Sequence, residues 1–488
     1  MSSEVPAVVC PQDVWREAVG FLLGDEKGRE RHCFALCGYS RQSGGGSRYL
    51  MRSLLLPGPG DIEDQAAAHV APSAAYLARA ITAVRRSGLA LAVLHSHPAS
   101  PIPAFSPVDD DADRTLAHHR RDLALPGPAF LSVVVGLRTL AARVLTEPDG
   151  EFNPVAWFRQ VGPAYNFNVL DDHAPCEVNY PVLRYDRQLR FLGAEGQRDL
   201  AACTVAIAGL GGTGSLAAEQ LARLGVGHFV LCDDDLVEEH NLNRLVGAGS
   251  ADVGRPKVEI AQALIKAGNP RAEVATAKAR VWQAPELFSR ADVLFGCEDS
   301  DAGRQALNEI ALRHVLPYID FSTEIFLARD SHRMEWALAQ CRVVVPGSTR
   351  CLACHEELDA QAAALERGES PVEEIARRAG YLSARPQTPT PSVIALNALI
   401  VSAGMIEFMK LFSGFAAPAA MLAYDALEQR LTRVSTERNP TCPACGLGGV
   451  LALGDLDPYA EELPRTARED AEALWLAGMA ERRRENAG

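Results

Sequence analysis

Short apolar runs alternate with helix-like stretches between about residues 181 and 451. Thr204–Ala208 and His228–Cys232 are apolar runs of strand length, and Ser215–Leu224 between them has apolar positions at helical spacing. Another apolar run begins at Val293 and ends at Asp299. Strands that alternate with helices are typical of a parallel α/β sheet. We therefore expect a Rossmann-like, mostly parallel sheet in residues 181–451.

The rest of the chain differs in composition. Residues 1–150 alternate apolar runs with glycine- and serine-rich loops, which predicts a separate domain, and the prolines of residues 151–180 indicate a linker. Residues 452–488, rich in Glu, Arg and Ala, predict an exposed helix. The apolar stretch from Val393 to Met405 is interrupted by Asn397 and is too short to span a bilayer, so we expect a buried helix.

Composition narrows the possible partners. A chain of 488 residues is expected to form roughly two to four domains. Its net charge of −14 argues against nucleic acid or an anionic membrane as the main partner. The chain has 12 cysteines, but its first residues lack the basic start and apolar run of a secretory signal. A reducing, cytoplasmic location fits better than a disulfide-forming one.

A glycine-rich turn joins the strand Thr204–Ala208 to the following helix. The glycines of this turn are Gly209, Gly211, Gly212 and Gly214. The amides and dipole of a helix N-terminus together form a cradle for phosphate groups. Asp233 ends the next strand, where a carboxylate accepts hydrogen bonds from ribose hydroxyls. On these residues alone, a nucleotide-binding transferase and a nicotinamide-dependent oxidoreductase remain equal alternatives.

Charged residues further along favour a triphosphate ligand. Arg244 and Lys257 supply two cations that hydride transfer does not need, and Asp235 and Asn241 lie in the same stretch. Asp299, at the carboxyl end of a strand, suits a Mg²⁺ ion that bridges phosphates. These residues favour ATP over a dinucleotide.

Two Cys-x-x-Cys pairs follow the nucleotide motif. They are Cys351/Cys354 and Cys442/Cys445. Four thiolates match the ligand count of a closed tetrahedral zinc site. Because the pairs are far apart in sequence, such a zinc joins distant segments and has a structural role.

Residues from about 179 to 446 resemble the ubiquitin-activating superfamily, specifically its bacterial adenylyltransferases for molybdopterin synthase and thiamine biosynthesis. Besides the residues above, they contain the family's Arg-Tyr-x-Arg-Gln motif, from Arg184 to Gln188. The resemblance implies adenylation of the C-terminal glycine of a ubiquitin-like protein by ATP and Mg²⁺. Asp233 would hold the ribose, Asp299 the metal, and Arg244 and Lys257 the phosphates. Arg187 would reach into a partner subunit, which implies a homodimer.

One departure bears on the fate of the adenylate. Relatives that form a thioester carry a nucleophilic cysteine between the two pairs, but no cysteine lies between Cys354 and Cys442. The hydroxyl groups of this segment that could accept the acyl group are those of Ser383, Thr388, Thr390 and Ser392. Cys341 precedes an apolar run and is expected to be structural. Either the reaction ends at the adenylate, which we favour, or a hydroxyl forms an oxyester. A conjugating enzyme or a sulfur donor would then follow.

The first segment carries a second set of metal ligands. The apolar strand from Leu89 to Leu94 runs into His95 and His97, whose side chains share one face of an extended chain, and Ser106 and Asp109 follow after a proline-rich loop. Two histidines and one aspartate leave an open position on zinc for a water molecule, as catalytic sites require.

Residues 1–150 resemble the JAMM metalloproteases, which have the MPN fold, an α/β fold. The resemblance rests on these four residues and on Glu17, in the stretch from Glu17 to Gly24. It implies that Glu17 is the general base and that Ser106 hydrogen-bonds the oxyanion or the water. The loop before Ser106 is one residue longer than is common, which leaves Asp110 or Asp111 as alternatives to Asp109.

Both resemblances together predict a bifunctional enzyme with one catalytic and one structural zinc. It would process the tail of a ubiquitin-like protein and then adenylate its terminal glycine. A second reading makes the first domain a binding module without catalysis, which presents the ubiquitin-like protein to the adenylation site.

Overall fold

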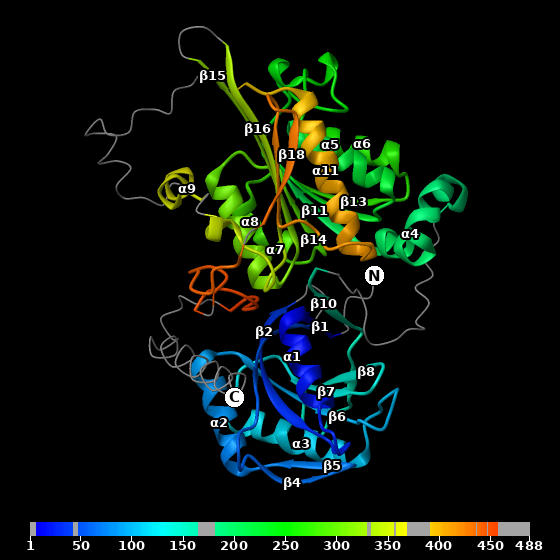
Figure 1. Cartoon of the computed structure of the whole chain (residues 1–488), viewed down its shortest axis with the longest axis vertical. Coiled ribbons are helices and arrows are strands. Elements are labelled where there is room, and N and C mark those ends of the chain that lie inside the picture. Colours follow the sequence, from blue (N-terminus) through cyan, green and yellow to red (C-terminus); the bar gives the residue numbers. More distant parts are fainter. Residues whose placement is uncertain are drawn as a thin grey trace, which may run out of the picture.

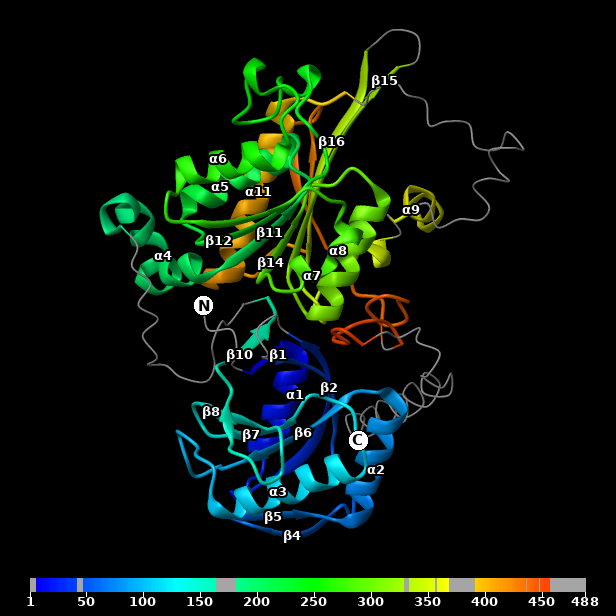
Figure 2. The same cartoon turned by 180° about the vertical axis from the view of Figure 1, so that it is seen from behind.

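A computed structural model describes most of the chain in two halves, each built on one eight-stranded sheet (Figure 1). The described residues are 6–41, 47–163, 181–328, 333–355, 358–367, 391–435, 437–446 and 448–456. Figure 2 shows the same arrangement from behind, with β1 and β10 of the first half facing the second half.

The first half is a mixed sheet with strand order β10-β1-β3-β2-β6-β7-β8-β9. Its strands are β1 (Ala7–Pro11), β2 (His32–Arg41), β3 (Ser47–Leu55), β6 (Ala90–Ser96), β7 (Phe130–Val135), β8 (Leu140–Leu145), β9 (Asn153–Pro154) and β10 (Trp157–Val161). A separate hairpin consists of β4 (Ile62–Ala66) and β5 (His69–Pro72). Residues 153–161, expected in a linker, therefore extend the sheet, because β10 pairs in parallel with β1. Residues 164–180 of the expected linker lie outside the described part.

Helices cover both faces of this sheet. They are α1 (Gln12–Leu23), α2 (Ala74–Ser87) and α3 (Pro107–Asp122). Because side chains alternate along a strand, β2 contributes to two cores. Cys33 packs with Trp15 of α1 on one face, and Phe34 packs with Tyr76 of α2 on the other. The alternation assigns α1 to one side of the sheet and α2 to the opposite side.

The second half has strand order β13-β12-β11-β14-β15-β16-β17-β18. The strands from β13 to β15 pair in parallel, which confirms the predicted Rossmann-like sheet, and β15 to β18 add an antiparallel edge. The strands are β11 (Thr204–Ala208), β12 (His228–Cys232), β13 (Glu273–Ala277), β14 (Val293–Gly296), β15 (Tyr318–Leu327), β16 (Met334–Val344), β17 (Met421–Asp425) and β18 (Arg430–Val434).

The helices of this half pack on both faces of its sheet. They are α4 (Val182–Ala202), α5 (Gly212–Leu224), α6 (Lys257–Gly268), α7 (Pro285–Phe288), α8 (Asp301–His314), α9 (Ala360–Arg367) and α11 (Ile394–Ser413). Four short 3₁₀ turns are η1 (Glu239–Asn241), η2 (Ser250–Asp252), η3 (Val281–Gln283) and η4 (Leu352–His355). The structure does not describe residues 457–488, so the predicted C-terminal helix lies outside it.

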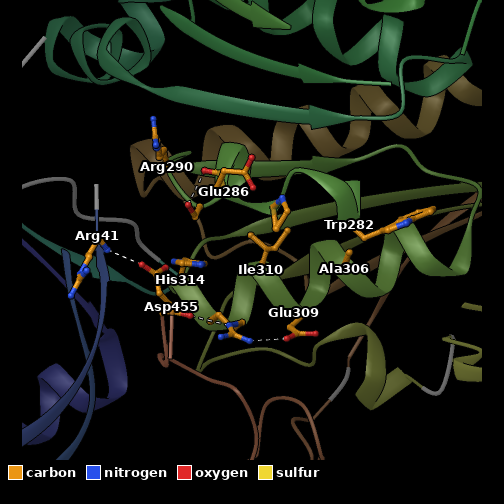
Figure 3. A pocket seen from close by; sticks show the side chains of 13 residues that line it. Arg41, Trp282, Glu286, Arg290, Ala306, Glu309, Ile310, His314 and Asp455 are labelled. Carbon is orange, nitrogen blue, oxygen red and sulfur yellow. Dashed lines mark hydrogen bonds and ion pairs between the residues drawn. The ribbon is translucent and has the colours of Figure 1, made fainter. Parts of the chain in front are cut away.

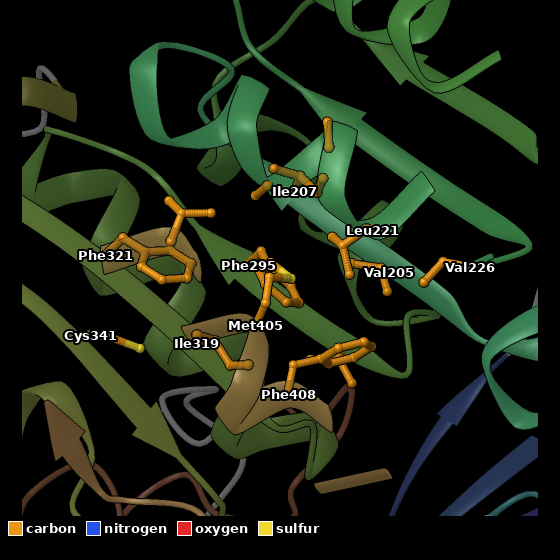
Figure 4. Packing of buried hydrophobic residues seen from close by; sticks show 14 of the residues in the cluster. Val205, Ile207, Leu221, Val226, Phe295, Ile319, Phe321, Cys341, Met405 and Phe408 are labelled. Carbon is orange, nitrogen blue, oxygen red and sulfur yellow. The ribbon is translucent and has the colours of Figure 1, made fainter. Parts of the chain in front are cut away.

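The helix α11 is central to the second core. It is long and apolar enough to cross a membrane by length and composition, yet it packs against α5, β15 and β16. Its Met405 and Phe408 lie against Phe295 and Ile319 of the sheet (Figure 4). The expected buried helix is thus found, and Asn397 lies within it.

The two halves are in direct contact. Val9 and Leu50 of the first half belong to the same apolar cluster as Val205 of the second. Arg48 Nη1 donates a hydrogen bond of 2.9 Å to the carbonyl of Ser289. A pocket of about 500 Å³ lies at this contact, where the backbone of Arg41 approaches Asp455 (Figure 3).

We expect Phe408→Ala to destabilise the second half by about 3–5 kcal/mol, because it removes a fully buried ring and leaves a cavity. The ring lies 5.5 Å from Phe295 and 4.5 Å from Phe412 between centroids. Chemical denaturation measures the change. The matched control, Leu427→Ala, removes a side chain that is 50% exposed and should cost less than about 0.5 kcal/mol. Equal losses for both variants would contradict the assigned core.

Candidate functional site: a nucleotide cradle and two metal centres

The glycine-rich turn can be formed only by glycines at two positions. Gly209, directly after β11, has a φ of +78°, and a Cβ there would lie 2.5 Å from the carbonyl oxygen of Cys297. A Cβ on Gly214 would lie 1.9 Å from the carbonyl oxygen of Gly209. The turn is therefore tight. The helix α5 begins at Gly212, and no side chain caps its first amides. Uncapped amides at a helix N-terminus can bind phosphate.

Asp233 lies against this turn at the end of β12. Its Oδ2 accepts a hydrogen bond of 2.6 Å from the amide of Leu210, and its Oδ1 accepts one of 2.8 Å from Asp235. Burial raises the pKa of Asp233 above its ordinary value. The two amides orient the carboxylate and leave lone pairs on both oxygens for a ribose.

Lys257 lies at the beginning of α6 and is nearly buried. Its Nζ is 2.6 Å from Oδ2 of Asp235, whose side chain is 59% exposed. An ion pair with an exposed carboxylate is weak, so a phosphate can compete for the ammonium group.

The chain also brings Arg244 to the glycine turn. A Cβ on Gly212 would lie 3.3 Å from Cγ and Cδ of Arg244, so this side chain runs across the turn. Its Nη1 donates a hydrogen bond of 2.8 Å to the carbonyl of His240. Asn241 has a local role, because its Oδ1 accepts a hydrogen bond from the amide of Glu238 and so caps η1.

Asn397 is a neighbour of the turn that the sequence analysis did not assign to the site. Its Nδ2 would lie 2.4 Å from a Cβ on Gly212. Its Oδ1 accepts a hydrogen bond of 2.9 Å from Thr323 Oγ1, and only 2% of the residue is exposed. In the sequence, the feature that could have pointed to Asn397 is its single amide side chain within a largely apolar predicted helix.

Asp299 follows β14, at the same edge of the sheet as the glycine turn, and is exposed. The preceding Glu298 was not predicted. Burial, followed by the charges of Asp233 and Asp299, raises the pKa of Glu298 to about 7. The carboxylates whose oxygens lie within 4.8 Å of one another at this edge are those of Asp233, Asp234 and Asp235. Carboxylate oxygens beside a phosphate cradle suit a divalent cation.

Arg187 is strongly exposed. It lies on α4, its side chain is 91% exposed, and its Nε is 3.8 Å from Oδ2 of Asp186. The side chain is therefore available to a second subunit.

The first half brings together His95, His97 and Asp109. Nε2 of His95 lies 3.1 Å from Oδ1 of Asp109, and Nε2 of His97 lies 3.6 Å from Oδ2. One ligand atom from each residue lies within 4.8 Å of the others. The buried Nε2 of His95 has no hydrogen-bond partner, so its approach to Asp109 lacks hydrogen-bond geometry. A buried nitrogen that faces a carboxylate and a second imidazole fits a zinc ion.

Ser106 orients the aspartate. As the N-cap of α3, it donates hydrogen bonds to Oδ2 of Asp109 from its amide, at 2.6 Å, and from its hydroxyl, at 2.7 Å. Its hydroxyl therefore supports the ligand rather than standing free for an oxyanion. Of the alternatives to Asp109, Asp110 pairs with Arg143 at 2.5 Å and Asp111 is exposed.

The prediction of Glu17 at the metal centre needs correction. Glu17 lies on the exposed side of α1, the helix that covers the Cys33 face of the sheet. His95 pairs with His32 across the strands, so its side chain belongs to the opposite face. An upstream carboxylate does lie at the centre, but it belongs to Glu30.

Glu30 shares the His32 face because it is two residues earlier in an extended segment. Its Oε1 is 3.6 Å from Nε2 of His97, and the residue is 8% exposed. Burial raises the pKa of Glu30. The β4–β5 hairpin holds its backbone, since the amide of Glu30 donates to Ala66 and its carbonyl accepts from Gln65 Nε2, both at 2.8 Å. In the sequence, the feature that could have pointed to Glu30 is its position just before the apolar run that forms β2.

The four paired cysteines meet in the second half. Sγ of Cys351 lies 3.8 Å from that of Cys354 and 3.7 Å from that of Cys442, and Sγ of Cys354 lies 3.3 Å from that of Cys445. Ligands at the corners of a tetrahedron with bonds of about 2.3 Å are about 3.8 Å apart. The thiols therefore fit a structural zinc.

Comparison with known proteins identifies the second half. The ThiF family model matches residues 185–444, which is more than half of the 488 residues. The SAMP-activating enzyme E1 of Haloferax volcanii is 32% identical over 296 residues, covering 57% of this chain and 93% of that protein. The sulfur carrier protein ThiS adenylyltransferase of Escherichia coli is 30% identical over 273 residues, covering 54% and 95%.

The molybdopterin-synthase adenylyltransferase of E. coli is 29% identical over 271 residues, covering 54% of this chain and 96% of that protein. Among solved structures, E. coli MccB aligns with 56% of this chain and 75% of its own, with a TM-score of 0.44 and 21% identity. The family model matches more than half of the chain, and the three relatives matched by sequence are covered almost completely, so the chain belongs to the ThiF family.

Proposed function

We propose that the second half adenylates the C-terminal carboxylate of a ubiquitin-like or sulfur-carrier protein at the expense of ATP. The observation that carries the proposal is the uncapped glycine cradle with Asp233, Arg244 and Lys257 around it. The names of the three ThiF-type relatives support this reaction class.

In this reaction a carboxylate oxygen of the carrier attacks the α-phosphorus of ATP. The bond from the α-phosphorus to the bridging oxygen breaks, and pyrophosphate leaves. The first amides of α5 bind phosphate oxygens, and Asp233 accepts hydrogen bonds from the ribose. Lys257 exchanges Asp235 for a phosphate and, with Arg244, offsets the charge that develops on the leaving group. Asp299 would hold Mg²⁺, which neutralises phosphate charge.

The adenylate is the favoured endpoint. Among the candidate hydroxyls only Ser392 belongs to the described residues; Ser383, Thr388 and Thr390 lie outside them. The hydroxyl of Ser392 accepts a hydrogen bond of 3.4 Å from Nδ2 of Asn397, an amide that cannot act as a base. A hydroxyl without a base is a poor nucleophile. A sulfur donor or a conjugating enzyme would take the activated carrier.

A homodimer remains part of the proposal. The exposed guanidinium of Arg187 supports a role in a second subunit's site. Exposed apolar side chains on the same helix, Leu183 and Phe191, support a protein contact there.

For the first half, we infer a zinc peptidase that trims or releases the carrier's tail. His95, His97 and Asp109 would hold zinc, which supplies Lewis acidity when bound. Glu30 takes the proton of the attacking water and gives it to the departing amine nitrogen. Ser106 positions Asp109. The alternative is a binding module without catalysis that presents the carrier.

Lys257→Ala should lower ATP–pyrophosphate exchange, measured with the carrier present, by about 100-fold, because one charge that stabilises the transition state is lost. Lys266→Ala is the matched control, since Lys266 is an exposed lysine in the last turn of the same helix. Equal exchange by the Lys257 and Lys266 variants would contradict the assigned phosphate site.

Glu30→Gln should reduce cleavage of a carrier with an extended tail by at least about 100-fold, because the general base is lost. Glu17→Gln should cleave at the normal rate. Zinc content, measured by atomic emission, should be equal in both. Loss of cleavage in Glu17→Gln alone would reinstate Glu17, and absence of cleavage by the unaltered protein would favour the binding-module alternative.

Incubation with ATP, Mg²⁺ and the carrier should give no covalent adduct between this chain and the carrier in an intact-mass spectrum, with pyrophosphate exchange intact. An adduct that resists thiols and yields to hydroxylamine would instead establish the oxyester.

A further inference from the structure

The residues directly after the second cysteine pair lie between the two halves of the molecule. We call residues 448–456 the docking segment. On one side, the amide of Ala452 donates to the carbonyl of Leu312 and that of Gly454 to Arg313, both at 2.9 Å. These bonds attach the docking segment to the end of α8.

On its other side, the docking segment pairs with β2 of the first half. The amide of Asp455 donates to the carbonyl of Tyr39 at 2.9 Å, and the amide of Arg41 donates to Oδ2 of Asp455 at 2.7 Å. A Cβ on Gly38 would lie 2.1 Å from the carbonyl oxygen of Ala452, so only glycine permits this approach. The docking segment is thus a strip of backbone bonded to both halves.

Arg52 of β3 adds a second attachment from the first half. Its Nη2 donates a hydrogen bond of 3.0 Å to the carbonyl of Gly449, and its Nη1 donates to Leu451. Burial lowers the pKa of Arg52 to about 10, so the guanidinium remains charged at neutral pH. A charged donor on carbonyl oxygens makes stronger bonds than a neutral one.

The cysteine turn determines where the docking segment begins. The amide of Gly446 donates to the carbonyl of Cys442 at 2.8 Å, and that of Val450 donates to Ala444 at 2.9 Å. A Cβ on Gly449 would lie 2.1 Å from the carbonyl oxygen of Ala444. The turn that supplies two thiols is therefore in direct contact with Gly449 and Val450, near the start of the docking segment.

We propose that the four-cysteine site is an interdomain latch. Zinc bound by the four thiols holds the cysteine turn closed, the closed turn fixes the docking segment, and the docking segment holds the first half in place. Ala444 and Val450 pack in an apolar cluster that also contains the thiols, so burial holds part of the turn. Structural zinc supplies further folding energy to a turn that provides its ligands. Removal of the zinc then loosens the contact between the halves.

The contacts of Arg48 with Ser289 and of Arg159 with Asp292 also join the halves, and none of these residues adjoins the cysteines. The inference therefore concerns the docking segment and the strands it touches, and it does not depend on either proposed activity.

The test is hydrogen exchange of the full chain, followed by mass spectrometry, before and after zinc removal by a chelator. A His95→Ala/His97→Ala variant serves as background, so that the thiol site is the one that loses metal. We expect peptides with Tyr39–Arg41 and with residues 450–455 to exchange at least about tenfold faster after removal. Unchanged exchange, with zinc loss verified by emission, would overturn the latch.

A second variant keeps the thiols. Arg52→Met should speed exchange in the same peptides while zinc remains bound. Linkage requires that it also weaken zinc binding, measured by equilibrium competition with the chelator. Arg85→Met, at an exposed arginine near the end of α2, is the matched control. If Arg52→Met changed neither the hydrogen exchange nor the zinc affinity, the proposed path from the thiols to the first half would be wrong. Retained pyrophosphate exchange would show that the variants are folded.

Discussion

Strands that are buried on both faces leave room for polar chemistry only where they end. From Ala90 to Leu94, β6 is fully buried, and its first imidazole follows at once. In the second half, β11 leads into the glycine turn, β12 into Asp233 and β14 into the carboxylates Glu298 and Asp299. A charged side chain further inside one of these four strands would lose its hydration without gaining an ion-pair or hydrogen-bond partner. The candidate sites of both halves follow from this constraint.

The same constraint explains what the sequence could predict. The glycine turn, the His-x-His pair and Asp233 are local features, because each follows an apolar run that can be read from the chain. The cysteine pairs were predictable as a set, since four thiols have a definite ligand count. The contacts of Arg52 with the docking segment were not predictable, because the carbonyls of Gly449 and Leu451, which accept its hydrogen bonds, have no signature in the sequence.

Glu17 and Glu30 show where such reasoning fails. Both precede apolar residues, but the face of the sheet that each reaches depends on which side α1 packs. That choice is a property of the whole domain. The strand β10 was assigned to a linker for a similar reason, since its partner β1 lies about 150 residues away in the chain. Asn397 meets the glycine turn only because α11 crosses α5.

One strand connects the two ends of the first half. Glu30 precedes β2, and Arg41 at its last position meets the docking segment. The strand β2 has ten residues, and at a rise of about 3.3 Å per residue its length is roughly 33 Å. The candidate peptidase centre therefore lies at the end of the first half that is remote from the docking segment, and α3 and α5 lie far apart in Figure 1. Under the two proposed functions, the carrier would have to leave one centre before it binds at the other, and the two reactions would take place in separate encounters.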